Sequence, residues 1–131
     1  MKNTVKLSLI GALGFLAGAS AMQVLHAQTA TAPAYLIGNI EKVTDEATFA
    51  QYRAAAGKSQ GPFGGHALVR DASPVPVDAS TLPQGKIVVL QFPSMKALQD
   101  WWNSPAYAAA RPLREKSTIG RTYAVEGIPA P

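Results

Sequence analysis

Arginine side chains in ordered segments are the groups in this chain best suited to recognising a ligand. Arg70 and Arg121 fall in strand-like segments, where a charged side chain needs a partner or a wet cavity. Arg111 and Arg114 lie near the end of a helix-like segment. A guanidinium group suits two-point contact with a carboxylate or phosphate. Two interpretations are open: ion pairs with Glu41, Glu115 or Glu126, or an acidic ligand.

Proton transfer has two candidate residues. His66 is the one histidine outside the N-terminal segment, and imidazole titrates near neutrality, so it can serve as a general base. Its simpler interpretation is a strand-end side chain bonded to the Gly64–Gly65 turn. Tyr52 can handle a proton in the same site, or it packs in the core and its hydroxyl finds a partner there.

Three further side chains are candidate ligand contacts. Asn39 and Gln91 are neutral amides on predicted strands, able to orient a bound carbonyl or to satisfy one another. Trp101, followed by Trp102, lies on the apolar face of a predicted helix. Its ring can stack on a ligand, although an aromatic residue at helical spacing more often belongs to the core.

Composition excludes several chemistries. The chain has no cysteine, which removes thiol nucleophiles, disulfides and cysteine-bound metal. Outside residues 1–27 the one histidine, His66, makes no His-pair metal site, and the glycine-rich stretch 61–65 lacks the Gly-Lys-Ser/Thr ending of a phosphate loop. We therefore expect no metal and no cofactor.

Residues 1–27 have the three parts of a secretory signal. Lys2 and Lys6 precede an apolar stretch, 7–21, and Ala27 ends the segment; cleavage after Ala21 is a second option. A permanent anchor is the alternative, although spanning a membrane takes about 20 apolar residues. We expect removal and a periplasmic or secreted protein, with membrane contact only through this segment if it stays uncleaved.

Removing this segment leaves ten basic and eight acidic residues, with no run of like charges. We therefore expect no nucleic-acid partner. The rest divides into a flexible leader, 28–33, one domain, 34–127, and a short tail, 128–131.

Hydrophobic periodicity and turn residues predict the elements of this domain. One helix starts at Thr44–Asp45 and stops at Gly57. A second starts after Ser94 and kinks or restarts at Ser104–Pro105, and Pro112 disfavours helical geometry just before it. Residues 73–78 form an edge strand or an irregular arm. The predicted strands are 34–41, 66–70, 86–92 and 118–126.

The order of these elements is two strand–helix–strand halves, which predicts a ferredoxin-like α+β fold: one antiparallel sheet with two helices on one face. A sheet covered on one side should alternate apolar with polar residues. Here Leu36 faces one way and Ile37 the other, and Val88 and Val89 repeat the pattern. A second copy of the chain is the expected cover, giving a two-fold homodimer.

A family resemblance adds to this prediction. Short motifs such as Phe92-Pro93-Ser94, Asn103-Ser104-Pro105 and Gly120-Arg121, with others in order from Ala34 to Gly127, resemble a bacterial family known only as domain of unknown function thirteen-thirty. The resemblance implies a dimeric α+β barrel, in which two ferredoxin-like sheets face each other around a pocket. The chain departs from the family at Asp71-Ala72, where a glycine pair is expected, and at Gln91, where an acidic residue is expected.

Three functions remain open from the sequence. The first is an exported homodimer that binds a small aromatic or acidic molecule in a pocket. The second is a cofactor-independent oxygenase or isomerase, an analogy of fold. The third is a structural or stress-associated dimer without a ligand.

Overall fold

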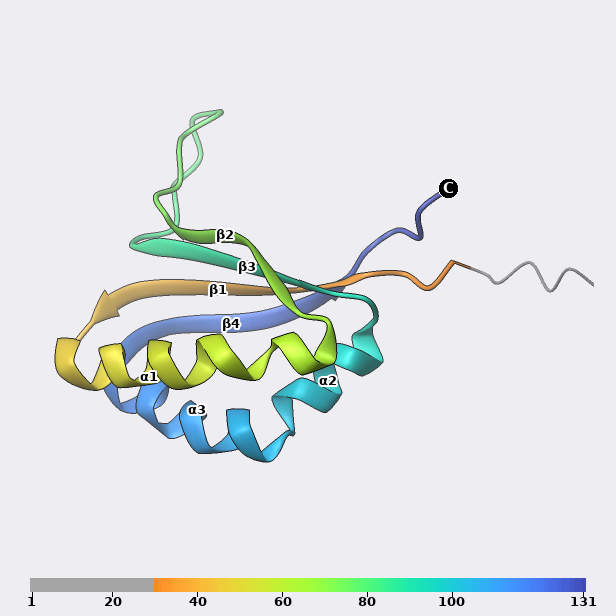
Figure 1. Ribbon diagram of the computed structural model, residues 1–131. Helices are drawn as coiled ribbons and strands as arrows, with labels where there is room; N and C mark the ends of the chain where they lie inside the picture. Colours follow the sequence, from red (N-terminus) through yellow and green to blue (C-terminus); the bar gives the residue numbers. More distant parts are fainter. Residues whose placement is uncertain (1–29) are drawn as a thin grey trace, which may run out of the picture.

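The computed structural model describes residues 30–131; the predicted signal segment, 1–27, lies outside the described residues. Four strands form one antiparallel sheet in the order β2-β3-β1-β4. The helices lie together on one face of this sheet, and the other face is open (Figure 1). This arrangement confirms the predicted ferredoxin-like α+β fold. The strands are β1 (Ala34–Val43), β2 (His66–Ala72), β3 (Lys86–Phe92) and β4 (Thr118–Glu126).

Helix starts follow the predicted caps. The Asp45 side chain accepts a hydrogen bond from the Thr48 amide and begins α1 (Glu46–Ser59). Hydrogen bonds from the Thr48 hydroxyl and amide lower the pKa of the Asp45 carboxyl. Ser94 caps α2 (Met95–Trp102), and Ser104 caps α3 (Pro105–Ser117). The predicted restart at Ser104–Pro105 is therefore confirmed, and it divides the second helical segment into α2 and α3.

Two predicted helix stops are wrong. Helix α1 continues past Gly57 to Ser59, and a short 3-10 turn, η1 (Gly61–Phe63), follows it. Helix α3 runs through Pro112. Proline inside a helix costs about 3 kcal/mol, but Pro112 is exposed while Tyr107 and Ala110 of the same helix are buried. Packing of the buried side of α3 outweighs the local penalty.

The core lies between the sheet and the helices, at the end where β1 begins. Its sheet side comes from β1 and β3, and its helix side comes from α2 and α3. Trp101 fills its centre, with its ring 5.1 Å from Phe92 and 4.0 Å from Tyr107. The buried residues are Ala34, Leu36, Leu90, Phe92, Leu98, Trp101, Tyr107 and Ala110.

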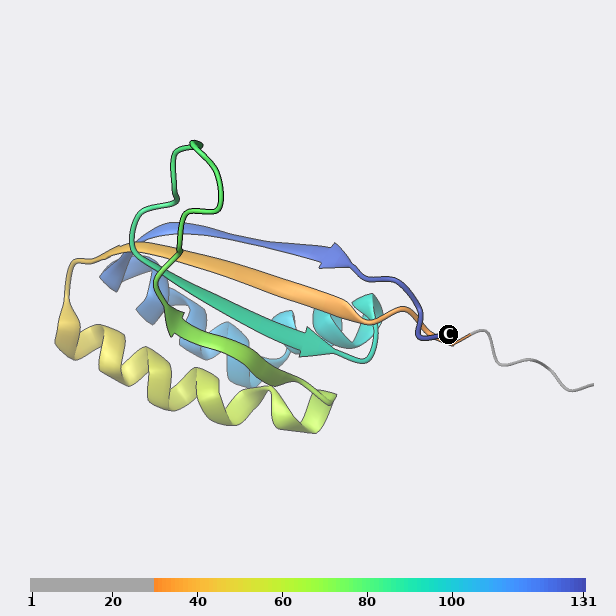
Figure 2. The ribbon, with the colours of Figure 1, turned by 90° about the horizontal axis from the view of Figure 1, so that it is seen from above.

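Residues 73–85 form an irregular arm between β2 and β3, the second of the two predicted alternatives. The arm rises on the side of the sheet away from the helices (Figure 1). Seen from above, it crosses toward β1 and β4 at one end of the sheet (Figure 2). Asn39 of β1 fixes its base, because its Nδ2 donates to the Gln84 carbonyl at 2.7 Å.

Candidate functional site

A cavity of about 320 Å³ lies between the inner face of the sheet and helices α1 and α3. It exists because small residues occupy inward positions there. Gly38 of β1 has no side chain, and Ala56 and Gly57 of α1 also line the space. The resemblance implied a pocket between two facing sheets, whereas this cavity lies within one protomer.

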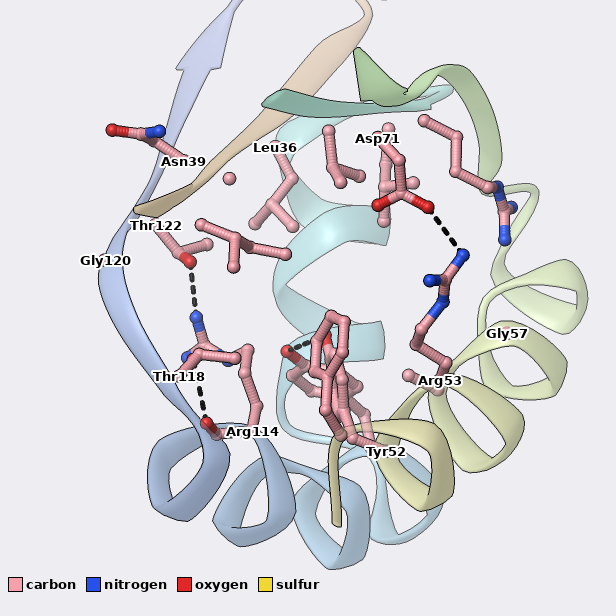
Figure 3. Close-up of a pocket in the computed structure, with 18 of the residues that line it drawn as sticks. Leu36, Asn39, Tyr52, Arg53, Gly57, Asp71, Arg114, Thr118, Gly120 and Thr122 are labelled. Atoms are coloured by element: carbon pink, nitrogen blue, oxygen red, sulfur yellow. Dashed lines mark hydrogen bonds and ion pairs between the residues drawn. The ribbon is translucent and has the colours of Figure 1, made fainter. Parts of the chain in front are cut away.

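The walls of the cavity are largely apolar and aromatic. Leu36, Val88 and Leu90 come from the sheet, while Phe49 and Trp101 come from the helices. Polar and charged side chains of α1, β2, α3 and β4 complete the lining, and Figure 3 shows several of them pointing inward.

Two phenols from different helices meet beside the cavity. The Tyr52 hydroxyl lies 3.4 Å from the Tyr107 hydroxyl, and either one can donate. Burial raises the pKa of Tyr52 well above its ordinary value, and the neighbouring Tyr107 adds to the rise. Tyr52 is therefore a neutral phenol near pH 7. It can donate a hydrogen bond but cannot act there as a ready-made base.

Four arginines line the cavity, against only two carboxylates, Asp71 and Glu115. Two of these arginines are paired. Arg53 of α1 bonds Asp71 of β2 at 2.5 Å across one side of the cavity (Figure 3), and Arg121 bonds Glu41 at 3.0 Å.

The other two arginines have no carboxylate partner. Within residues 30–131, neither Arg70 nor Arg114 forms an ion pair. The two differ in exposure, because Arg70 is exposed to solvent and Arg114 is partly buried.

Asp71 has an unusual backbone conformation, with φ at 53°. This left-handed region favours glycine, which is the residue that the family resemblance led us to expect here. Aspartate is among the residues that tolerate the region best. In this conformation the Asp71 carboxylate accepts a hydrogen bond from Arg53.

Five of the seven predicted site residues line the cavity. They are Asn39, Tyr52, Arg70, Trp101 and Arg121. Trp101 also belongs to the core, since its Nε1 donates to Ser59 Oγ at 2.9 Å. Asn39 and Arg121 also border a second hollow on the open face of the sheet, beneath the arm.

His66 and Gln91 lie elsewhere. They face each other across β2 and β3, and neither lines the cavity. Sequence position alone does not separate these two from the other five. Gln91 lies on the same face of the sheet as Asn39, because its partner Tyr35 is four residues before Asn39 on β1. The bulges of β2 shift its register with β3 after Ala67, so the place of Arg70 does not follow from alternation either.

Arg114 and Tyr107 were not selected as site residues from the sequence. The sequence indicates Arg114 only as one of four arginines, and it does not single out Tyr107. Tyr52 and Tyr107 are 55 positions apart, so no pattern in the sequence reveals that their hydroxyl groups meet.

Metal and membrane features are not evident in the described part of the chain. No group of three or more His, Asp or Glu side chains in residues 30–131 is placed to hold a metal ion. Over the same range, no helix is both long enough and apolar enough to span a bilayer.

Comparison with known families gives a match over residues 33–128 to a family described as "Domain of unknown function (DUF1330)". The chain belongs to this family. The DUF1330 match covers every strand and helix described above. No curated protein matched this DUF1330 chain in a sequence search.

Solved structures share the fold of this DUF1330 protein. The methylated RPA0582 protein superposes with a TM-score of 0.59 at 13% identity, over 78% of this chain and 85% of that one. A second RPA0582 structure, a protein of unknown function from Rhodopseudomonas palustris, gives 0.52 at 17% identity, over 79% and 88%.

An enzyme also shares it. SnoaB, a cofactor-independent oxygenase from Streptomyces nogalater, gives a TM-score of 0.52 at 8% identity, over 76% of this chain and 97% of that one. At these identities the likeness establishes the fold and not the activity.

Proposed function

We propose that this protein is an exported homodimer that binds a small, ring-containing molecule in the cavity between its sheet and its helices. The observation that carries the proposal is the cavity itself, which joins apolar walls to a few convergent polar groups. That combination is typical of small-molecule sites.

The size of the cavity limits the ligand. A cavity of about 150 Å³ accepts benzene in a protein core, and this one measures about 320 Å³. One ring or two fused rings therefore fit. The aromatic side chains of Phe49 and Tyr52 in the lining suit an aromatic ligand.

The homodimer is supported by the open face of the sheet. Ile37 of β1 pairs with Val89 of β3 and with Tyr123 of β4, so three neighbouring strands present apolar side chains there. Tyr123 is 50% exposed and Val125 is 42% exposed. Burying such a patch against an identical patch removes both from water. Export rests on the signal-like segment 1–27.

A thermal-shift and calorimetric titration with 2-naphthol and indole tests ligand binding. We expect saturable stabilisation of the purified protein by at least one of these probes. A ligand present at a hundred times its Kd adds about 2.7 kcal/mol to the free energy of unfolding.

Gly38→Val is the matched variant for this titration. A Cβ at Gly38 meets Val88 at 3.8 Å and Thr122 at 4.0 Å, which are ordinary contacts, so the Cβ fits without a clash. We expect the two further methyl groups of valine to extend into the cavity. We expect the variant to fold and to lose binding. Gly61→Ala, where an added Cβ meets nothing within 4 Å, is the control. Equal binding by Gly38→Val and the wild type would place the ligand elsewhere and reject the cavity.

A cofactor-independent oxygenase is the second candidate, favoured by the shared fold with SnoaB. In that case the aromatic substrate itself supplies electrons to O2. Oxygen-electrode measurements with naphthols that bind the protein separate the two functions: uptake that requires the protein supports the enzyme, and binding without uptake supports a binding protein.

A further inference from the structure

We propose that the ligand is an aromatic carboxylate, held as its anion by Arg114 with the Tyr52–Tyr107 pair beside it. This inference rests on the proposed function and adds the chemical class of the ligand. It starts from the one cavity arginine that is partly buried and has no carboxylate partner among the described residues.

Only some of the N–H groups of the Arg114 guanidinium have hydrogen-bond partners among the described residues. Nη1 donates to the Thr122 hydroxyl of β4, as Figure 3 shows. Nε is sealed from solvent and has no hydrogen-bond partner. Among residues 30–131 no acceptor bonds Nη2, which is not sealed in this way. A partly buried cation with an open donor is a site for an anion, because the anion offsets the cost of holding that charge out of water.

The position of the guanidinium is fixed by its surroundings. Besides Thr122, the Trp102 ring lies 5.6 Å from the Arg114 Cζ atom. Arg111 packs against the same ring, with its Cζ 4.5 Å from the ring centre. Its Nη2 also donates to the Trp102 carbonyl. Thr122 and Trp102 are positioning residues, and Arg114 is the residue that contacts the ligand.

The tyrosine pair supplies a second donor. Two hydroxyl groups share one hydrogen bond, so one O–H proton has no acceptor in the other phenol. The charge of Arg114 is felt at the Tyr52 hydroxyl, where it opposes the rise in pKa caused by burial. Tyr52, Tyr107 and Arg114 all line the same cavity. A carboxylate has two oxygens, one for Nη2 and one for the free phenol proton.

The other arginines of the lining do not offer the same site. Arg53 and Arg121 already contact Asp71 and Glu41. The Arg121 side chain is 72% exposed, so water weakens its attraction for an anion. Arg70 is exposed as well.

The test compares 2-naphthoate with 2-naphthamide, a neutral probe of similar shape, by calorimetry on the purified protein. We expect naphthoate to bind at least about tenfold more tightly, since a hydrogen bond to a charged group is stronger than a neutral one. Arg114→Gln should remove the preference and leave naphthamide binding in place. Arg121→Gln, at an arginine that is already paired, should keep the preference.

Each outcome decides a different claim. Equal affinity for the two probes overturns the carboxylate and leaves the cavity proposal standing. A preference that survives in Arg114→Gln overturns the role of Arg114. Binding of neither probe, nor of 2-naphthol or indole, overturns both proposals. If Arg114→Gln does not fold, Thr122→Val, which removes only the hydroxyl that orients Arg114, should reduce the preference at least about threefold.

Discussion

The hydroxyl oxygens of Tyr52 and Tyr107 lie 3.4 Å apart and join helix α1 to helix α3 at the cavity. The two residues are 55 positions apart in the chain. Their contact therefore fixes α1 and α3 relative to each other where both helices line the cavity.

Titration of Tyr52 should make stability depend on pH in the alkaline range. Burial, and then Tyr107, raises the pKa of Tyr52 in the folded chain above the value of about 10 expected when unfolded. The unfolded chain therefore loses this proton first, and the free energy of unfolding falls as pH rises above about 10. The limiting slope for one proton is about 1.4 kcal/mol per pH unit.

Urea denaturation of the wild type and of Tyr52→Phe between pH 8 and pH 11 (a range set by the phenol pKa of about 10) measures this slope. We expect a flatter profile for Tyr52→Phe. Identical profiles for the wild type and Tyr52→Phe would rule out this assignment.

Two glycines should respond to alanine in opposite directions. A Cβ at Gly120 would overlap the Asn39 carbonyl oxygen, because β4 and β1 approach closely beside a bulge. Gly120→Ala should cost about 1–3 kcal/mol or more. Gly57 lies inside α1 with nothing within 4 Å, so Gly57→Ala should gain about 0.5–1 kcal/mol. Thermal denaturation checks both, and a change of the same sign at both positions would contradict the structure.

The indole of Trp101 should dominate the stability of the core. The residue is 1% exposed, and Trp101→Ala should lower the free energy of unfolding by about 3–5 kcal/mol. Ser59→Ala removes the acceptor of its N–H and should cost about 1–3 kcal/mol. Denaturation followed by circular dichroism measures both. Ser80→Ala in the exposed arm is the control, and a loss no larger than the control's would refute the packing described.

The proposed homodimer should separate when charge enters the open sheet face. Sedimentation equilibrium at micromolar concentration should give a dimer for the wild type and a monomer for Tyr123→Arg, since an unpaired charge at a buried interface is costly. Ala109→Arg, on the exposed side of α3, should remain dimeric. A monomeric wild type would exclude the dimer.

Local pattern determined most of the fold. Strands β3 and β4 have the bounds predicted from alternation and turn residues, and Asp45, Ser94 and Ser104 cap the helices as predicted. These features depend on neighbours within a few residues, so the sequence contains them directly. Gly57 and Pro112 are the exceptions, because packing of α1 and α3 outweighed their local preferences.

Tertiary structure alone decided the site. The sequence pointed to arginines and tyrosines without showing which ones meet. The bulges of β2 decided where Arg70 lies, and the packing of α3 placed Arg114 against Thr122 and brought Tyr107 to Tyr52. Contacts between segments far apart in the chain depend on how whole elements pack. No local pattern encodes them. The fold was therefore predictable from the sequence, whereas the Arg114 guanidinium without a carboxylate partner in the cavity was not.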